Sequence, residues 1–171
     1  STYEQRLEDH SSAFLVIQRA VGEDGEDPHS LSELERLAGV TEEWEALAET
    51  WQASIPTMED AFQQGEYWAK LATVLRDKLD RLEDSVVYFT KVLEEQPEHV
   101  GTLEALVELH AILEDWSALI QTLKAQIEVT PNFVEQVKIA VRVGDIYERQ
   151  LSDQESAIQA YKDVLELDER A

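Results

Sequence analysis

Cysteine is absent from the 171-residue chain, which excludes a disulfide framework, a thiolate metal site and a cysteine nucleophile. Basic residues are scarce, because 14 Lys and Arg stand against 37 Asp and Glu, for a formal net charge of −23. Nucleic-acid binding and adhesion to an anionic membrane both need a basic surface, so we expect neither. No apolar run approaches the length of a transmembrane helix, and no membrane insertion is expected. A protein partner of basic or mixed charge remains compatible with this composition.

Motifs that carry chemistry are also missing. The four histidines, His10, His29, His99 and His110, are widely spaced and form no paired helical metal motif. Phosphate-binding glycine loops, a nucleophile elbow and an EF-hand pattern do not occur. Neighbouring carboxylates such as Glu94 and Glu95 arise by chance in so acidic a chain. We therefore expect no catalytic residue, no metal and no cofactor.

An internal repeat is the strongest feature that the sequence does contain. The stretch YEQRLEDHSSAF, which begins at Tyr3, reappears as YERQLSDQESAI from Tyr147. A middle copy lies halfway, so that equivalent residues are spaced by 72. Repetition at a fixed period indicates a stacked-repeat architecture. Aligned sets include Leu7, Leu79 and Leu151; Ala13, Ser85 and Ala157; Ile17, Phe89 and Tyr161; and Trp44 with Trp116.

Each 72-residue unit divides into two helix pairs. Pro97 and Pro131 bracket a 34-residue segment, and Glu169 stands where the next proline would fall, after 38 residues. Apolar residues recur at three- and four-residue spacing, which predicts helices and no strands. We expect helix caps at Ser30, Thr41 and Ser152. The predicted helix pairs cover about 1–25, 29–55, 57–97, 98–131 and 132–171.

The pattern resembles the tetratricopeptide repeat. The last pair shows it best, with small and aromatic residues at the family's places. The two short pairs depart from the consensus, with Leu31 and Leu103 at the place of Trp and with Leu47 and Leu119 at the place of Ala. Alternation of 34 and 38 residues is similar to repeats in large bacterial scaffold proteins. The residues that carry the resemblance are Ala140, Val143, Gly144, Tyr147, Ala157, Tyr161 and Val164, with Trp68, Leu71, Ala72, Leu75, Ser85, Phe89, Val92 and Pro97 in the middle long pair.

The resemblance implies a fold class and an arrangement. We expect an all-α, right-handed α-solenoid of about five stacked helix pairs that runs through residues 1–171 as a single array. The chain begins inside a first helix and ends just after a second, without a polar capping helix at either end. We therefore expect a fragment of a longer array, whose uncovered apolar stripes allow end-to-end self-association.

The family resemblance also places a binding face. In this family the first helix of each pair lines the concave face. Most of the basic residues fall on predicted first helices. Most of the acidic residues fall on the second helix of each pair and on the turns. For most single residues we favour ion pairs within the chain, such as Arg76 with Asp80 or Arg142 with Asp145. For the basic residues of the first helices taken together, we favour a role in lining a groove that holds a partner. The predicted partner-binding residues are Arg36, Lys70, Thr73, Arg76, Asp77, Glu108, Val141, Asp145 and Arg149.

One known activity of the family is disfavoured. Some members clamp the terminal carboxylate of a peptide with Lys at the fifth and Asn at the ninth place of their first helices. The fifth places here hold Ser32, Ala69, Glu104 and Val141, and the ninth places hold Arg36, Thr73, Glu108 and Asp145. We therefore expect no such clamp. Four aromatic residues outside the consensus places, Phe62, Tyr67, Tyr88 and Phe133, are either packing neighbours or exposed anchors.

The function that follows is a non-enzymatic scaffold module that binds a protein or peptide on its concave face. The alternative is a structural spacer or self-assembly segment of a larger repeat protein. A small GTPase is one partner class open to a bacterial scaffold, but nothing in these residues selects it. We expect a cytoplasmic location, with the periplasm as the alternative.

Overall fold

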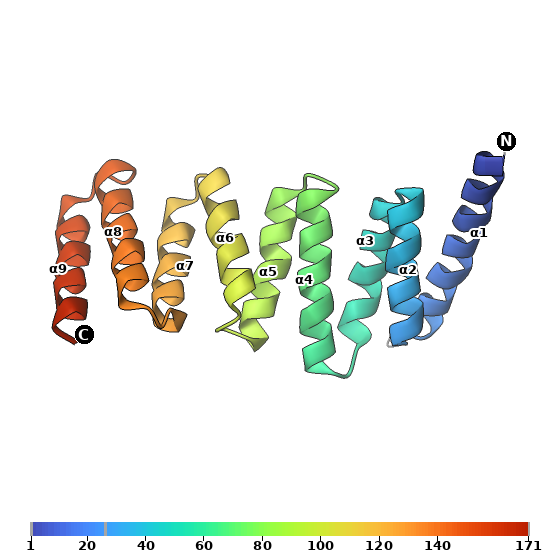
Figure 1. The fold of residues 1–171 in the computed structure, drawn as a ribbon, viewed down its shortest axis with the longest axis horizontal. Helices are drawn as coiled ribbons and strands as arrows, with labels where there is room; N and C mark the ends of the chain where they lie inside the picture. The colour runs from blue at the N-terminus through green and yellow to red at the C-terminus, as the bar shows by residue number, and fades with distance from the viewer. Residues whose placement is uncertain (1, 26, 171) are drawn as a thin grey trace. The chain divides into compact units, whose positions relative to one another are not determined.

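All of the regular structure in residues 2–25 and 27–170, which the computed structural model describes, is helical (Figure 1). The chain separates by its internal contacts into two units, Ser1–Glu95 and Gln96–Ala171, and each is described by itself. A single array through residues 1–171 thus stays a prediction. In unit 1 the elements are α1 (Thr2–Glu23), α2 (Pro28–Thr41), α3 (Trp44–Ser54), the short 3-10 helix η1 (Ile55–Thr57), α4 (Ala61–Asp77) and α5 (Leu82–Glu95).

Unit 2 repeats the last four α-helices of unit 1. Its first helices are α6 and α8, which correspond to α2 and α4, and its second helices are α7 and α9, which correspond to α3 and α5. The starts of α3 and α7, and those of α5 and α9, lie 72 residues apart, as the sequence repeat requires. The elements of unit 2 are α6 (Val100–Ile112), α7 (Trp116–Val129), α8 (Phe133–Arg149) and α9 (Gln154–Arg170).

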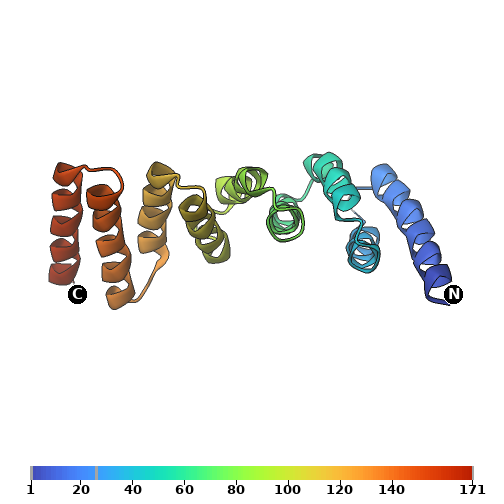
Figure 2. The same cartoon turned by 90° about the horizontal axis from the view of Figure 1, so that it is seen from above.

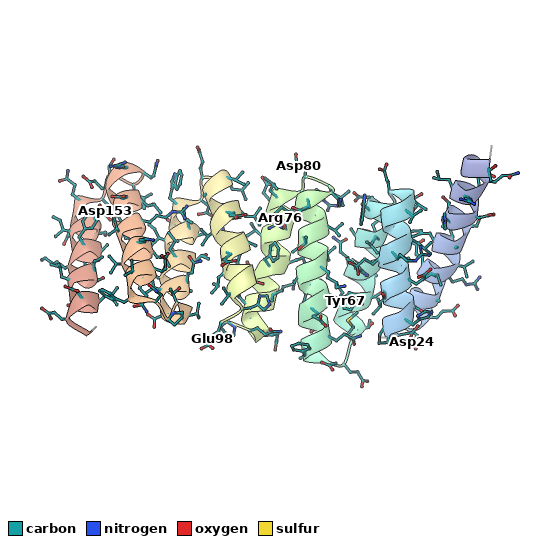
Figure 3. The ribbon with its side chains drawn as sticks, in the orientation of Figure 1. Asp24, Tyr67, Arg76, Asp80, Glu98 and Asp153 are labelled. Atoms are coloured by element: carbon teal, nitrogen blue, oxygen red, sulfur yellow. The ribbon has the colours of Figure 1, made fainter. Side chains whose placement is uncertain are left out.

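The turns between helices repeat at the same distance. Asp80, between α4 and α5, has a φ of 53°, and Ser152, between α8 and α9, has a φ of 51°. A left-handed residue ends an α-helix, and the amide that follows returns to a carbonyl of the last turn. Arg81 N donates to Leu75 O at 2.8 Å, and Asp153 N donates to Tyr147 O at 2.8 Å. Figure 3 labels Asp80 and Asp153 at these two turns.

The first segment differs from the expected helix pair at about 1–25. Residues 2–23 form one helix, α1. By the 72-residue spacing, Glu8 is equivalent to Asp80 and Ser152, and the chain turns between two helices at both of those residues. Left-handed backbone is costly for a residue with a Cβ atom, whereas a continued helix keeps every backbone hydrogen bond. At Glu8 the helix continues without a turn.

Helix caps were assigned wrongly from the sequence. α2 begins at Pro28, and its cap is Asp27, whose side chain accepts from Ser30 N at 2.9 Å. Proline suits the first turn because its missing N–H would be unsatisfied there, so the helix begins ahead of Ser30. Before α9 the carboxylate of Asp153, and not the Ser152 hydroxyl, accepts from Ser156 N at 3.0 Å. Thr41 ends α2 and donates to Leu37 O at 2.9 Å.

The core of unit 1 joins all of its helices. Leu31, Leu34 and Leu37 recur along one face of α2 and are fully buried. They meet the buried face of α3 and the leucines of α4, which is what amphipathic helices of this period require. The cluster also contains Phe14, Val21, Leu47, Trp51, Leu71, Leu75 and Val92.

Unit 2 has its own core. Leu119 and Leu123 of α7 pack against Val143 and Ile146 of α8, and Ala160 brings in α9. In Figure 1 and in the perpendicular view of Figure 2, α8 lies between α7 and α9. The two second helices of unit 2 therefore both pack on the same first helix.

Candidate functional site

The predicted binding residues of unit 1 are held by ion pairs within the chain. Lys70 Nζ of α4 lies 2.8 Å from Glu35 Oε2 of α2, and Arg36 is paired with Glu33 within α2. Burial acts to lower the pKa of Lys70, but the hydrogen bond and charge of Glu35 outweigh it and raise that pKa. The cationic side chains of α2 and α4 thus already have carboxylate partners.

Arg76 of α4 also forms an ion pair within the chain. Arg76 Nε lies 2.7 Å from Asp77 Oδ1, so its partner in the structure is Asp77 and not the predicted Asp80. The hydrogen bond from Arg76 lowers the pKa of the Asp77 carboxyl group. The guanidinium also lies 5.7 Å from the centroid of the Phe89 ring. Arg76 is labelled in Figure 3. Thr73 donates to Ala69 O at 2.8 Å, within its own helix.

Unit 2 presents a different arrangement, on α8. Arg142 and Arg149 are separated by two helical turns and are both exposed, so they lie on one face of the helix. Among the described residues, neither has a carboxylate within ion-pair distance. In a chain of charge −23, these two arginines place positive charge on one face of α8. They are the candidate site of this unit.

A shallow depression of about 130 Å³ lies at these arginines. Its apolar part comes from Trp116 and Leu119 of α7 and from Ile146 of α8. Planar guanidinium groups beside a partly apolar floor suit a carboxylate or phosphate, because they offer paired N–H donors in a partly dry place. The residues that line the depression are Trp116, Leu119, Arg142, Asp145, Ile146, Arg149 and Gln150.

Asp145 lies at this depression with a partner of its own. The hydroxyl of Tyr161 donates to Asp145 Oδ1 at 2.6 Å, so Asp145 bonds to α9 and not to Arg142 as predicted. This hydrogen bond raises the pKa of Tyr161 to about 12. The hydrogen bond thus joins α9 to α8.

The structure brings together only part of the predicted set. Asp145 and Arg149 lie at the depression, whereas Glu108 and Val141 are exposed and do not line it. Arg142 and Trp116 were missed as site residues, since Arg142 was assigned to an ion pair and Trp116 to packing. The seven-residue spacing of Arg142 and Arg149, which places both on one helix face, is the signal that could have identified Arg142.

The four aromatic residues outside the consensus places divide between the two interpretations. Tyr67 is buried and meets Trp51 edge-on, and Tyr88 stacks on Trp68 (Tyr67 is labelled in Figure 3). Phe133 is half-buried, and Phe62 has 67% of its surface exposed. Only Phe62 is therefore placed as an exposed anchor would be.

In residues 2–25 and 27–170, no three or more His, Asp or Glu side chains gather so as to hold a metal ion. No helix of the described chain combines the length and the apolar character needed to cross a membrane. The absence of catalytic activity stays a prediction.

Comparison with known proteins identifies the class. Residues 137–170, which span most of α8 and α9, match the family model of the tetratricopeptide repeat. No curated protein is similar enough in sequence to count as a match. The fold over nearly the whole chain is nevertheless that of solved tetratricopeptide-repeat proteins, as the following structures show.

Three solved structures illustrate the likeness. A crystal structure of MamA is 13% identical with a TM-score of 0.56, and the match covers 98% of this chain and 93% of that one. MamA of Desulfovibrio magneticus RS-1, from residue 41 to its end, is 14% identical with a TM-score of 0.52, covering 99% and 94%. YrrB, described as a TPR protein with an unusual peptide-binding site, is 15% identical with a TM-score of 0.56, covering 95% and 80%.

The chain thus has the all-α fold of tetratricopeptide-repeat proteins, and residues 137–170 match the family model of that repeat. The predicted resemblance and the predicted fold class are confirmed. A fold of this kind supports a protein–protein interaction scaffold in general.

Proposed function

We propose that the chain is a protein-interaction module that holds an acidic segment of its partner on the first-helix face of unit 2. The observation that carries the proposal is the pair Arg142 and Arg149, exposed on α8 without an ion pair in the described part of the chain. This face belongs to the predicted concave surface. Of the predicted partner-binding residues, the proposal keeps Asp145 and Arg149, together with their neighbours on α8.

The chemistry favours a carboxylate-bearing partner. An arginine can bind a carboxylate through two parallel N–H donors, and such charge-assisted bonds are stronger than neutral ones. Trp116 lies beside the pair in the depression, and tryptophan and arginine are the residues that most often dominate binding energy at interfaces. In unit 1 a partner would first have to displace Glu35 from Lys70 or Asp77 from Arg76. The cost of that exchange favours unit 2.

Capture of partners from a lysate tests the proposal by comparing three baits. The wild-type chain is compared with Arg142→Glu/Arg149→Glu and with a matched control, Arg19→Glu/Lys162→Glu, which changes the net charge equally on α1 and α9. We expect a partner that wild type and control retain and that the α8 variant loses, with circular dichroism unchanged. Equal capture by all three baits would show that the first-helix face of unit 2 is not the binding surface.

Self-assembly is the second candidate, and exposed apolar side chains support it. Val134 and Val141 of α8 and Ile158 and Leu165 of α9 each keep more than a third of their surface in solvent. Sedimentation of the wild type over a range of concentrations, beside Ile158→Glu/Leu165→Glu, tests it. A mass that rises with concentration in the wild type alone would favour self-assembly.

A further inference from the structure

The two units differ at a place that holds aromatic side chains in unit 1. Trp68 of α4 and Tyr88 of α5 stack with ring centroids 5.1 Å apart and an interplanar angle of 15°. Lys91 completes the arrangement, with its Nζ 5.4 Å from the centroid of the Trp68 ring. An aromatic pair covered by a cation thus lies between α4 and α5 of unit 1.

Unit 2 has none of these three side chains at the equivalent places. At a spacing of 72 residues, Ala140 replaces Trp68, Ala160 replaces Tyr88 and Asp163 replaces Lys91. The backbone elements that carry them, α8 and α9, match α4 and α5 in their starting positions. Two aromatic rings have therefore been exchanged for two methyl groups on the same scaffold, and the cation for an anion.

The exchange leaves a groove of about 500 Å³ bounded by α7, α8 and α9. This volume is typical of a ligand pocket. Its floor includes Ala140, Val143 and Ala160, each of them buried. The groove is thus wide enough for an aromatic ring and has an apolar floor to receive one.

The rim of the groove is acidic. Glu128 of α7 and Asp163 and Glu166 of α9 line it, and none of them has a cationic partner among the described residues. The single cation there, Lys124, faces Tyr147, with its Nζ 3.5 Å from the hydroxyl and 5.6 Å from the ring centroid. The free charge at the rim is negative, which favours a positively charged ligand.

We propose that this groove binds a segment of a protein partner in which a tryptophan or tyrosine lies next to a lysine or arginine. The ring occupies the space that Trp68 and Tyr88 fill in unit 1, and the basic side chain pairs with Asp163 or Glu128. Unit 1 is the template, because there the chain supplies the same ring and cation itself. The groove differs in face and in charge from the arginine face of α8, so the proposal does not depend on the proposed function.

A second copy of the chain is a poorer occupant. Among the aromatic side chains that the structure describes, the exposed one is Phe62, which follows Glu59 and Asp60 and lies next to two glutamines. A segment of that charge would meet the acidic rim with repulsion. The partner chemistry that fits is therefore basic as well as aromatic.

Binding of three synthetic peptides to the full chain tests the proposal. The peptides share one frame and carry Lys-Trp-Lys, Lys-Ala-Lys or Glu-Trp-Glu at the centre, and fluorescence anisotropy reports the affinity. We expect the Lys-Trp-Lys peptide to bind at least about tenfold more tightly than either of the others, since burial of a large apolar side chain accounts for such a factor. Equal affinity for all three, or no binding, would overturn the proposal.

Two variants locate the site. Ala140→Trp/Ala160→Tyr transplants the unit 1 pair and should abolish the preference for Lys-Trp-Lys while the chain stays folded. Should that variant unfold, Glu128→Gln/Asp163→Lys on the rim takes its place, with a loss of about tenfold expected. Arg142→Glu/Arg149→Glu should bind the peptides as the wild type does, which separates the groove from the proposed function. If the folded groove variant or the folded rim variant binds Lys-Trp-Lys as tightly as the wild type does, the assignment is overturned. It is also overturned if the wild type self-associates and Ala140→Trp/Ala160→Tyr does not.

Discussion

The ring of Tyr161 in α9 lies so close to Gly144 in α8 that a Cβ atom at residue 144 would come 2.5 Å from Cε1 of the ring. Real Cβ atoms do not approach another carbon so closely, so glycine is required for this helix contact. The equivalent place in unit 1 pairs Ala72 with Phe89, a ring that lacks the hydroxyl. In unit 2 the hydroxyl holds the ring in place through Asp145.

Gly144→Ala should destabilise unit 2. The added methyl group forces the Tyr161 ring away from α8 and strains its hydrogen bond to Asp145, although alanine by itself favours a helix. Overpacking of this kind costs about 1–3 kcal/mol of the free energy of unfolding. Urea denaturation followed by circular dichroism measures the change.

Two further variants control this experiment. Gly22→Ala places its methyl group in open space at the end of α1 and should leave stability unchanged or slightly raised. Gly144→Ala/Tyr161→Phe releases the ring and should recover part of the loss, because unit 1 carries Ala72 and Phe89 at the equivalent places. Full stability in the single Gly144→Ala variant would contradict the packing argument.

Tyr161 should ionise with a pKa of about 12, since its hydroxyl donates to Asp145 and its phenolate would face that carboxylate. The pKa is raised above the ordinary value of 10.0, so the folded state holds the proton more tightly. The stabilisation is complete below pH 10.0 and is lost as the pH rises from there to about 12. Tyrosinate absorbance in wild type and Asp145→Asn measures this. An identical titration of residue 161 in both proteins would argue against the hydrogen bond.

His110 should make the protein less stable under mild acid. Burial lowers its pKa below the ordinary 6.5, and the charge of Asp115 opposes this only in part. The folded state therefore prefers the neutral ring, and the unfolded chain takes up the proton first. Stability is greatest above pH 6.5 and falls as the pH drops from 6.5 toward the lower pKa of the folded state. Urea midpoints over this range should fall less steeply for His110→Gln than for the wild type.

The ion pair of Lys70 and Glu35 should contribute little to stability. Both side chains are partly in solvent, with 41% and 38% of their surface exposed. Pairs of this kind contribute about 0.2–1 kcal/mol, because solvent screens the charges and two long side chains lose freedom. A double-mutant cycle with Lys70→Ala and Glu35→Ala measures the coupling. A coupling energy above about 2 kcal/mol would show that α2 and α4 depend on this bond.

Helices and repeats were predictable from the sequence, whereas helix ends and charge partners were not. Apolar spacing locates a buried face such as that of Leu31, Leu34 and Leu37 without knowledge of what covers it. A left-handed turn depends on the backbone, and Glu8 shows that the residue type at that place does not reveal it. The partner of Arg76 depends on which neighbouring carboxylate its side chain reaches, and that is decided by helix geometry.

By itself the sequence determined the 72-residue repeat and the all-α class, because helices that pack in the same geometry need the same kinds of residue at the same places. Tertiary structure decided what lies between those helices. Ala140 and Ala160 are ordinary helical residues in the sequence, and they form a groove only because α8 and α9 pack side by side and α7 borders the same space. Asp145, which the sequence pairs with Arg142, bonds instead to Tyr161 of α9.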